Sequence, residues 1–450
     1  MKYKFFLLLF FLSTGSVIFA CFWDYDTVEM ERQRFPNIIE LLSGNFLRHS
    51  QEYHFWRIKD REEKLQTNSD SLSLMDDLAV SYSKTGNDKQ AIKIGHSQLL
   101  IQPNRYETLA NLGTFYIHNG DLASGITYID RAIDVNPNAH FGREIYQRHL
   151  AAYVFSKKVN GKIPLPLASK FQKNPEALPN PKQLDNFYTF LLNKHLDTIN
   201  SIEDEKFEIP SDKRSNMLPH KKLKEAIIGI MGMMKFGNTD SPILAEVLGD
   251  LLMATGWKDG ARQLAARAYL KASYDCKNKQ AEKVYRKRVE YVLFHQYTKK
   301  RGSQFTIKDL EAMYQEERIL GQKFFNRIKN DEIKWIAQGK QPEIEFGKKY
   351  YSEPVLGERI QKASAKWRNN HEYLTDTLVG TTVNYRTENK NNKISNAKAK
   401  ETVDSLLHNN QSIPVKNPKV MPKSSNSWFF YVIGIILLIG LSVAIRKKLK

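Results

Sequence analysis

Two consecutive stretches of the sequence, equal in length, repeat one another. Residues 71–104 align with residues 105–138, and several aligned positions carry the same or a closely similar residue. These pairs, all separated by the same distance along the chain, are Leu78 with Leu112, Ala79 with Gly113, Tyr82 with Tyr116, Gly86 with Gly120, Ile92 with Ile126 and Pro103 with Pro137. A fixed period of about 20 to 50 residues is typical of arrays in which each unit buries its apolar face on the next. This repeat constrains the fold more than composition does.

Each unit carries the pattern of two helices joined by a turn. Apolar residues recur three and four positions apart, as they do on the buried face of a helix. Gly86 and Gly120 suit the turn, and Pro103 and Pro137 end the second helix of each unit. The small Gly113 allows the two helices of its unit to approach closely. The sequence therefore predicts two consecutive helical pairs.

This pattern resembles the tetratricopeptide repeat, which carries a Leu-Gly or Leu-Ala pair, a later Tyr, a turn glycine, an alanine in the second helix and a late proline. The second-helix alanine is present as Ala91 and is replaced by Gly125 in the next unit. A third copy is expected in residues 243–273, where Gly249 and Ala261 keep the register. The resemblance implies an all-α fold, a tetratricopeptide-type solenoid with additional long helices.

The resemblance also implies binding of a protein partner, because such arrays present a concave groove lined by the first helix of each unit. The groove positions carried over to this chain are Ser73, Asp76, Val80, Ser83, Lys84, Glu107, Ala110, Thr114, Ile117 and His118. Some relatives clamp the terminal carboxylate of a peptide with a Lys/Asn pair. Asp76 and Val80 occupy those places here, and only Asn111 matches a later clamp position, so a receptor for peptide C-termini is not expected. The alternative is that these residues are solvated helix surface.

The two ends of the sequence predict export and membrane anchoring. Residues 1–20 have the charged start and apolar run of a signal peptide. Residues 428–445 form an uncharged run long enough for one transmembrane helix, followed by a basic tail at 446–450 that favours the cytoplasmic side. We expect a single-pass protein of a bacterial inner membrane with its body in the periplasm. The terminal Lys-Lys-Leu-Lys also resembles a dilysine retrieval signal, so the endoplasmic reticulum membrane is the alternative.

The start of the mature chain contains a cysteine and a pair of aspartates. Cys21 is a candidate for lipidation or for a disulfide with Cys276, and an unmodified terminus is the third alternative. Asp24 and Asp26 superficially resemble the first motif of haloacid dehalogenase-type phosphotransferases. That motif needs a strand before it, whereas a signal peptide precedes these residues, so we expect them to be the exposed start of the mature chain. The helices after them are predicted to cap the first repeat through Phe35, Ile38, Ile39 and Leu42.

Changes in composition divide the chain into segments. Asn, Lys and Ser dominate residues 386–427, which contain too few apolar residues to fold and read as a basic, disordered stalk. Thr306 followed by Asp309 predicts the start of a long charged helix. Between the signal peptide and the stalk we expect an N-terminal helical cap at 21–70, two repeats at 71–138, a helix and Pro-rich connector at 139–215, further repeat-like helices at 216–275 and long charged helices at 276–385.

The chain is strongly basic, with 68 lysines and arginines, 49 aspartates and glutamates and a net charge of +19. This excess favours contact with anionic surfaces, so a charge-driven binder of anionic polymer or membrane surface is the first alternative function. Nucleic acid is not an expected partner because the export signal argues against it.

Motifs for catalysis and metal binding are not recognisable in the sequence. His49 and His54 are five positions apart, which is not the spacing of a helical zinc site. The sequence lacks a Gly-rich phosphate loop, a nucleophile elbow and a Cys/His cluster. We therefore expect no metal, no cofactor, no small-molecule substrate and no enzyme activity, with an unrecognised helical hydrolase or transferase as the second alternative.

Overall fold

The computed structural model describes residues 22–32, 35–137, 142–171, 173, 179–203, 217–255, 261–294 and 305–351. The chain divides into two units, 1–391 and 392–450, and all described residues belong to the first. Within them the regular structure is helical, apart from an isolated bridge between Val159 and Lys162. The prediction of an all-α fold is confirmed for this part of the chain.

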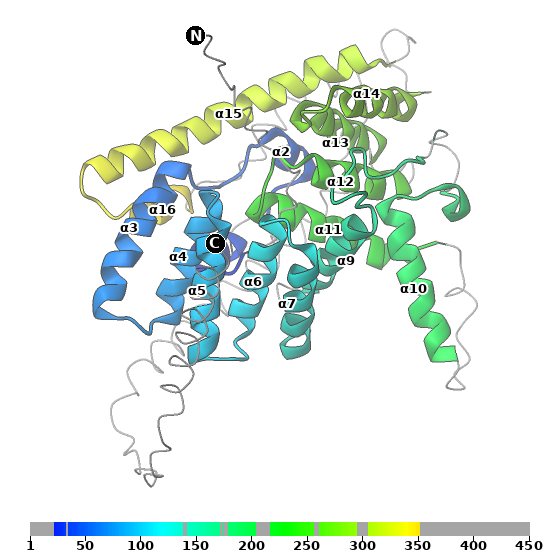
Figure 1. Cartoon of the computed structure of the whole chain (residues 1–450). Helices are drawn as coiled ribbons and strands as arrows, with labels where there is room; N and C mark the ends of the chain where they lie inside the picture. The colour runs from blue at the N-terminus through cyan, green and yellow to red at the C-terminus, as the bar shows by residue number, and fades with distance from the viewer. Residues whose placement is uncertain are drawn as a thin grey trace, which may run out of the picture. The chain divides into compact units, whose positions relative to one another are not determined.

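The helices follow one another along the chain as shown in Figure 1. The N-terminal helices are α1 (Tyr25–Arg32), α2 (Ile38–Ser43) and α3 (Gln51–Thr67). The helices of the repeat region are α4 (Leu72–Lys84), α5 (Asp88–Ile101), α6 (Tyr106–His118) and α7 (Leu122–Val135). The central helices are α9 (Glu144–Ser156), the short η1 (Pro181–Gln183), α10 (Phe187–Glu203), α11 (His220–Phe236), α12 (Pro242–Ala254) and α13 (Ala261–Asp275). The last described helices are α14 (Lys279–Leu293), α15 (Ile307–Ala337) and α16 (Pro342–Tyr350).

The predicted helical pairs are confirmed. The bounds of α6 follow those of α4 by one repeat length, and the bounds of α7 follow those of α5 by the same length. Both turn glycines, Gly86 and Gly120, have φ of +86°, a conformation that residues with a Cβ rarely adopt. A Cβ on Gly113 would lie 2.5 Å from a side-chain carbon of Ile129, so the close approach of α6 and α7 needs glycine. Helices α3 to α7 contact one another in chain order, and α7 contacts α9.

The region predicted as a third copy also forms two packed helices, α12 and α13. Gly249 of α12 faces the ring of Tyr269 of α13, since an added Cβ would lie 2.7 Å from that ring. Helix α11, which lies within the predicted repeat-like helices at 216–275, packs on α12. These helices carry much of the main hydrophobic core.

The long helix α15 crosses over several other elements, and its predicted start at Thr306 is confirmed by a reciprocal capping box with Asp309. Helix α2 packs on α15, α13 and α11. The Tyr314 hydroxyl of α15 donates to the carbonyl of Leu42 at 2.7 Å. The prediction that Phe35, Ile38, Ile39 and Leu42 cap the first repeat is therefore wrong. Instead α3 covers the first pair by packing on α4.

Several predicted segments lie outside the described residues. These are the signal peptide at 1–20, Cys21, the last part of the charged helices after 351, the stalk at 386–427, the transmembrane helix at 428–445 and the tail at 446–450. In the part of the chain that the structure describes, no helix combines the length and apolar character needed to cross a bilayer. Cys276, the other candidate for a disulfide, is buried.

Candidate functional site

The predicted groove residues lie on α4 and α6, and most of them are covered by other parts of the chain. Ser73 is exposed, whereas Lys84 and Glu107 are half-buried. The buried members are Asp76, Val80, Ser83, Ala110, Thr114, Ile117 and His118. Asp76 and Thr114 contact other helices of the chain, whereas His118 contacts Phe22 at the N-terminal end of the described chain.

Some of these residues join the helices to one another. Asp76 accepts hydrogen bonds from Arg105 at 2.8 Å and from the amide of Gln98 at 2.8 Å. Burial raises the pKa of Asp76 to about 6, although both partners act in the opposite direction. Thr114 accepts a hydrogen bond at 3.0 Å from Gln147 of α9. Asp76 and Thr114 therefore hold the helices of the array together.

The N-terminal end of the described chain packs against α4 and α6. We call residues 22–30 the N-terminal segment. The main-chain N–H of Trp23 donates to Oδ1 of Asn111 at 2.7 Å, and Nδ2 of Asn111 donates back to the carbonyl of Trp23 at 2.8 Å. The N–H of Tyr25 donates to Asp77 at 3.1 Å. Residues of α4 and α6 thus bind the main chain of this segment.

The side chain of Phe22 fills an apolar site between α4 and α6. It is 1% exposed and belongs to the hydrophobic cluster of the first helical pair. Its ring meets the ring of Phe115 at 5.9 Å and that of His118 edge-on at 5.2 Å, measured between centroids. The ammonium group of Lys84 lies 4.8 Å from the centre of the Phe22 ring. Lys84 and His118, two of the predicted groove residues, therefore do contact a polypeptide segment, which belongs to the same chain.

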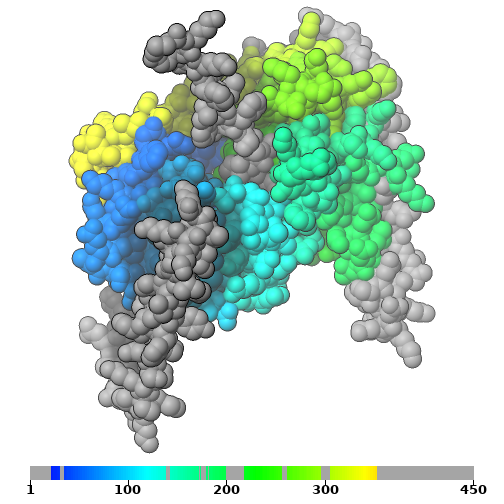
Figure 2. Space-filling model, viewed as in Figure 1, coloured from blue at the N-terminus to red at the C-terminus, as the bar shows by residue number. Residues whose placement is uncertain are grey.

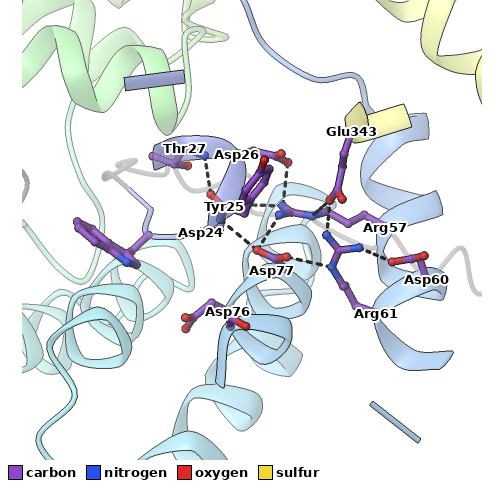
Figure 3. A network of polar contacts seen from close by, with 12 residues as sticks. Asp24, Tyr25, Asp26, Thr27, Arg57, Asp60, Arg61, Asp76, Asp77 and Glu343 are labelled. Carbon is purple, nitrogen blue, oxygen red and sulfur yellow. Dashed lines mark hydrogen bonds and ion pairs between the residues drawn. The ribbon is translucent and has the colours of Figure 1, made fainter. Parts of the chain in front are cut away.

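A buried network of charges fixes the next residues of the segment (Figure 3). Arg57 of α3 is fully buried, and its guanidinium lies 2.5 Å from Asp24, 3.0 Å from Asp26, 2.7 Å from Asp77 and 3.1 Å from Glu343. Asp24 and Asp26 are 4% and 6% exposed. The prediction that these two aspartates are the exposed start of the mature chain is wrong. A buried carboxylate is stable only with partners, and here Arg57 supplies them.

Arg61, one turn after Arg57 on α3, extends the network. It donates to Asp77 at 2.9 Å and also pairs with Asp60 and Glu343. Glu343 lies on α16, and Figure 2 shows the yellow surface, which includes α16 and the end of α15, against the blue surface of the N-terminal helices. The network therefore joins the first and last described elements of the chain through α3.

His49, just before α3, connects this network to α15. Its Nδ1 lies 2.6 Å from Glu332, its Nε2 lies 3.6 Å from Asp26, and its ring stacks on Tyr53 with 3.8 Å between centroids. Burial alone would lower the pKa of His49, but the carboxylates of Asp26 and Glu332 outweigh it and raise the pKa to about 9. Arg57 and His49 outweigh burial at Asp26 and hold its pKa far below the usual range. His49 is thus a buried cation at neutral pH.

The described residues contain no group of three or more His, Cys, Asp or Glu side chains placed to hold a metal ion. His49 and His54 lie near one another, with 6.2 Å between ring centroids. The ring nitrogens of His49, however, face the carboxylates of Asp26 and Glu332. The site therefore binds main-chain amides, the two aromatic side chains of Phe22 and Trp23, and the carboxylates of Asp24 and Asp26, all of which belong to the N-terminal segment.

Part of this site was visible in the sequence. Asn111 matches a clamp position of the repeat, but nothing local indicates that its ligand lies 88 residues earlier. Tyr53, Arg57 and Arg61 are spaced four apart, which puts them on one face of a helix. Such a polar stripe in a helix that must pack on α4 is a signal for a buried network, and the sequence reasoning missed it.

Comparison with known proteins does not assign the chain to a family. No protein-family model matches the sequence, and no similar curated protein was found.

Proposed function

We propose that this protein is a scaffold for protein–protein interaction built on tetratricopeptide-type repeats. It is exported and anchored in a membrane by residues 428–445, with the body in the periplasm of a bacterium or, as the alternative, in the endoplasmic reticulum. The constant offset of one repeat length between the pairs α4–α5 and α6–α7 supports the repeat type.

The observation that carries the proposal is the double hydrogen bond between the Asn111 side chain and the main chain of Trp23. These two hydrogen bonds are made only to main-chain peptide groups, so a polypeptide of any sequence could form them. Specificity comes from the apolar site that holds Phe22 and from Trp23, whose ring meets that of Tyr106 edge-on at 5.6 Å. The groove therefore recognises an aromatic pair in a polypeptide, and a partner segment of this kind competes with the chain's own N-terminal segment.

A synthetic peptide of residues 22–30 tests this proposal. The full-length protein is purified in detergent as Phe22→Ala/Trp23→Ala, which weakens its own segment, and is titrated with the labelled peptide by fluorescence anisotropy. We expect saturable binding to this variant. Unmodified protein should bind the peptide far more weakly, because a tethered segment competes at an effective concentration of about millimolar.

Asn111→Ala in the same background should raise the Kd about tenfold or more, since two hydrogen bonds of about 1 kcal/mol each are lost. Asn119→Ala is the matched control, because Asn119 is exposed at the end of the same helix. Equal peptide binding by the unmodified protein and both variants would contradict a peptide-binding groove.

The orientation of the protein in the membrane is tested separately by adding protease to intact spheroplasts of a bacterial host. Protection of the body would contradict a periplasmic location.

A further inference from the structure

A cavity of about 740 Å³ lies beside the N-terminal segment. Its other walls are formed by residues of α2, α4, α13 and α15, by the segment before α3 and the start of α3, and by the end of α11 with the turn that leads to α12. Figure 1 shows α3 and α4 on one side of this region, α11 to α13 on the other and α15 across both. Cavities of several hundred Å³ are the size that small-molecule ligands occupy. The cavity is therefore much larger than a bare ion needs.

Positive charge exceeds negative charge on the cavity wall. Five lysines and arginines line it against four aspartates. His49 also lines it, but Glu332, which is not part of the wall, balances its charge. Two of the aspartates, Asp24 and Asp26, are already bonded to Arg57, which is not part of the wall. The other two, Asp240 and Asp275, lie 3.0 Å and 3.1 Å from Lys271. The wall thus has a net positive charge before any ligand binds.

Three of the cations and two of the aspartates meet where three elements come together. Lys271, Arg48 and Arg318 all act on Asp240 and hold its pKa below the usual range, although burial opposes them. Burial lowers the pKa of Arg48 to about 10, and the attraction of Asp240 only partly opposes this. Arg318 lies over the ring of Tyr274 at 5.1 Å. These side chains come from α13, α15 and the segment before α3, so a negative group beside Asp240 would face three cations at once.

A buried histidine adds a hydrogen-bonding group to the same cavity. His54 lines the cavity and is 8% exposed, and its Nδ1 has no hydrogen-bond partner among the described residues. Burial and the neighbouring Lys84 lower its pKa well below the ordinary value, so the ring is neutral. Nδ1 itself is enclosed by protein. A neutral imidazole still offers its other ring nitrogen, as a donor or an acceptor, to a ligand hydroxyl in the cavity.

We propose that this cavity binds a small hydroxylated anion, of the class of sugar phosphates and sugar acids, with its charged group beside Arg48, Lys271 and Arg318 and its hydroxyls toward His54. This inference goes beyond the proposed scaffold function and departs from the sequence-based expectation of no small-molecule ligand.

The proposal is tested with the full-length protein in detergent, by isothermal titration calorimetry and thermal unfolding. The probes are glucose 6-phosphate, glucuronate, inorganic phosphate and uncharged glucose. We expect saturable binding of at least one of the two charged sugars, with a Kd at least about tenfold lower than that of glucose or of inorganic phosphate, because neither of these offers both kinds of group.

Arg318→Gln should raise the Kd of the charged sugar about tenfold or more. Lys323→Gln is the matched control, since Lys323 is exposed on the same helix and does not line the cavity. If Arg318→Gln does not fold, Gln322→Glu replaces it, because this exposed wall residue then adds a repelling charge. His54→Phe should reduce the preference for glucose 6-phosphate over inorganic phosphate.

The proposal is overturned if neither charged sugar binds saturably at millimolar concentrations. It is also overturned if the control variant weakens binding as much as the cavity variants do, because the effect would then come from the overall positive charge. The peptide titration uses a different ligand, so its failure and the failure of sugar binding are distinguishable.

Discussion

Arg57→Met tests whether the buried network holds the body together. The guanidinium of Arg57 is fully buried and lies 2.5 Å from Asp24, 2.7 Å from Asp77 and 3.1 Å from Glu343. Methionine keeps much of the length of the side chain and removes its charge. Breaking a buried ion pair from one side leaves the other charge without compensation, which costs about 3 to 5 kcal/mol. We expect a loss of unfolding free energy of this size at pH 7.

The loss should shrink at pH 5. Burial already raises the pKa of Asp77 in the unmodified protein, although Arg57 opposes it. Without Arg57 the folded-state pKa of Asp77 rises further above its unfolded value, so the folded state of the variant binds this proton more tightly than its unfolded state does. Lowering the pH therefore restores stability to the variant.

Urea unfolding of the full-length protein in detergent, followed by circular dichroism at pH 7 and pH 5, measures both effects. Lys59→Met is the control, because Lys59 lies on the same helix with a side chain that is 81% exposed, and its pairing with Glu63 contributes little. A loss below about 1 kcal/mol for Arg57→Met at pH 7, or an equal loss at both pH values, would refute the reasoning.

Three further changes test other features of the fold. The pKa of His49 is raised from 6.5 to about 9, so its contribution of about 3 kcal/mol to the unfolding free energy is fully present below pH 6.5 and is lost as the pH rises through 9. Urea unfolding from pH 6 to 9.5 should show this fall in stability. An identical pH profile for His49→Gln would contradict it. In Gly321→Ala the new Cβ would lie 2.2 Å from the carbonyl oxygen of Ser43. The forced shift of α2 against α15 should lower stability by about 1 to 3 kcal/mol in a thermal melt. An unchanged melting temperature would show that these helices do not pack this closely. Gly113→Leu should separate α6 from α7, since even a Cβ meets Ile129 at 2.5 Å, and should destabilise the protein more than Gly113→Ala does, which the same melts would reveal.

The helical pairs were predictable because their signals are local. The turn conformation of Gly86 and the close contact at Gly113 depend on residues within one unit, and both follow from the repeat period. The capping box at Thr306 is local in the same way. Patterns of this kind predict elements and their immediate neighbours well.

The site was less predictable because its contacts are distant. The segment Asp24-Tyr25-Asp26 is polar and follows an apolar run, so local reasoning places it in solvent. The burial of Asp24 and Asp26 depends on Arg57 of α3, whose guanidinium also pairs with Glu343 of α16. Likewise, α2 is a short apolar helix that could pack on any exposed core surface, and its place under α15 depends on Gly321. No local pattern pairs residues that are separated by such lengths of chain.

The connection between Arg57 and Glu343 has a consequence for the order in which the protein folds. The helices α4 to α7 can pair as soon as they leave the ribosome, because their contacts are between neighbours. Glu343 follows the end of α6 by roughly 225 residues, which take about 10 to 45 s to synthesise. Closing so long a loop also costs more chain entropy than closing the short loops between neighbouring helices. Throughout this interval Arg57, which binds Asp24 and Asp26 of the N-terminal segment, lacks its pairing with Glu343, so the network around the segment is completed only when α16 has been made.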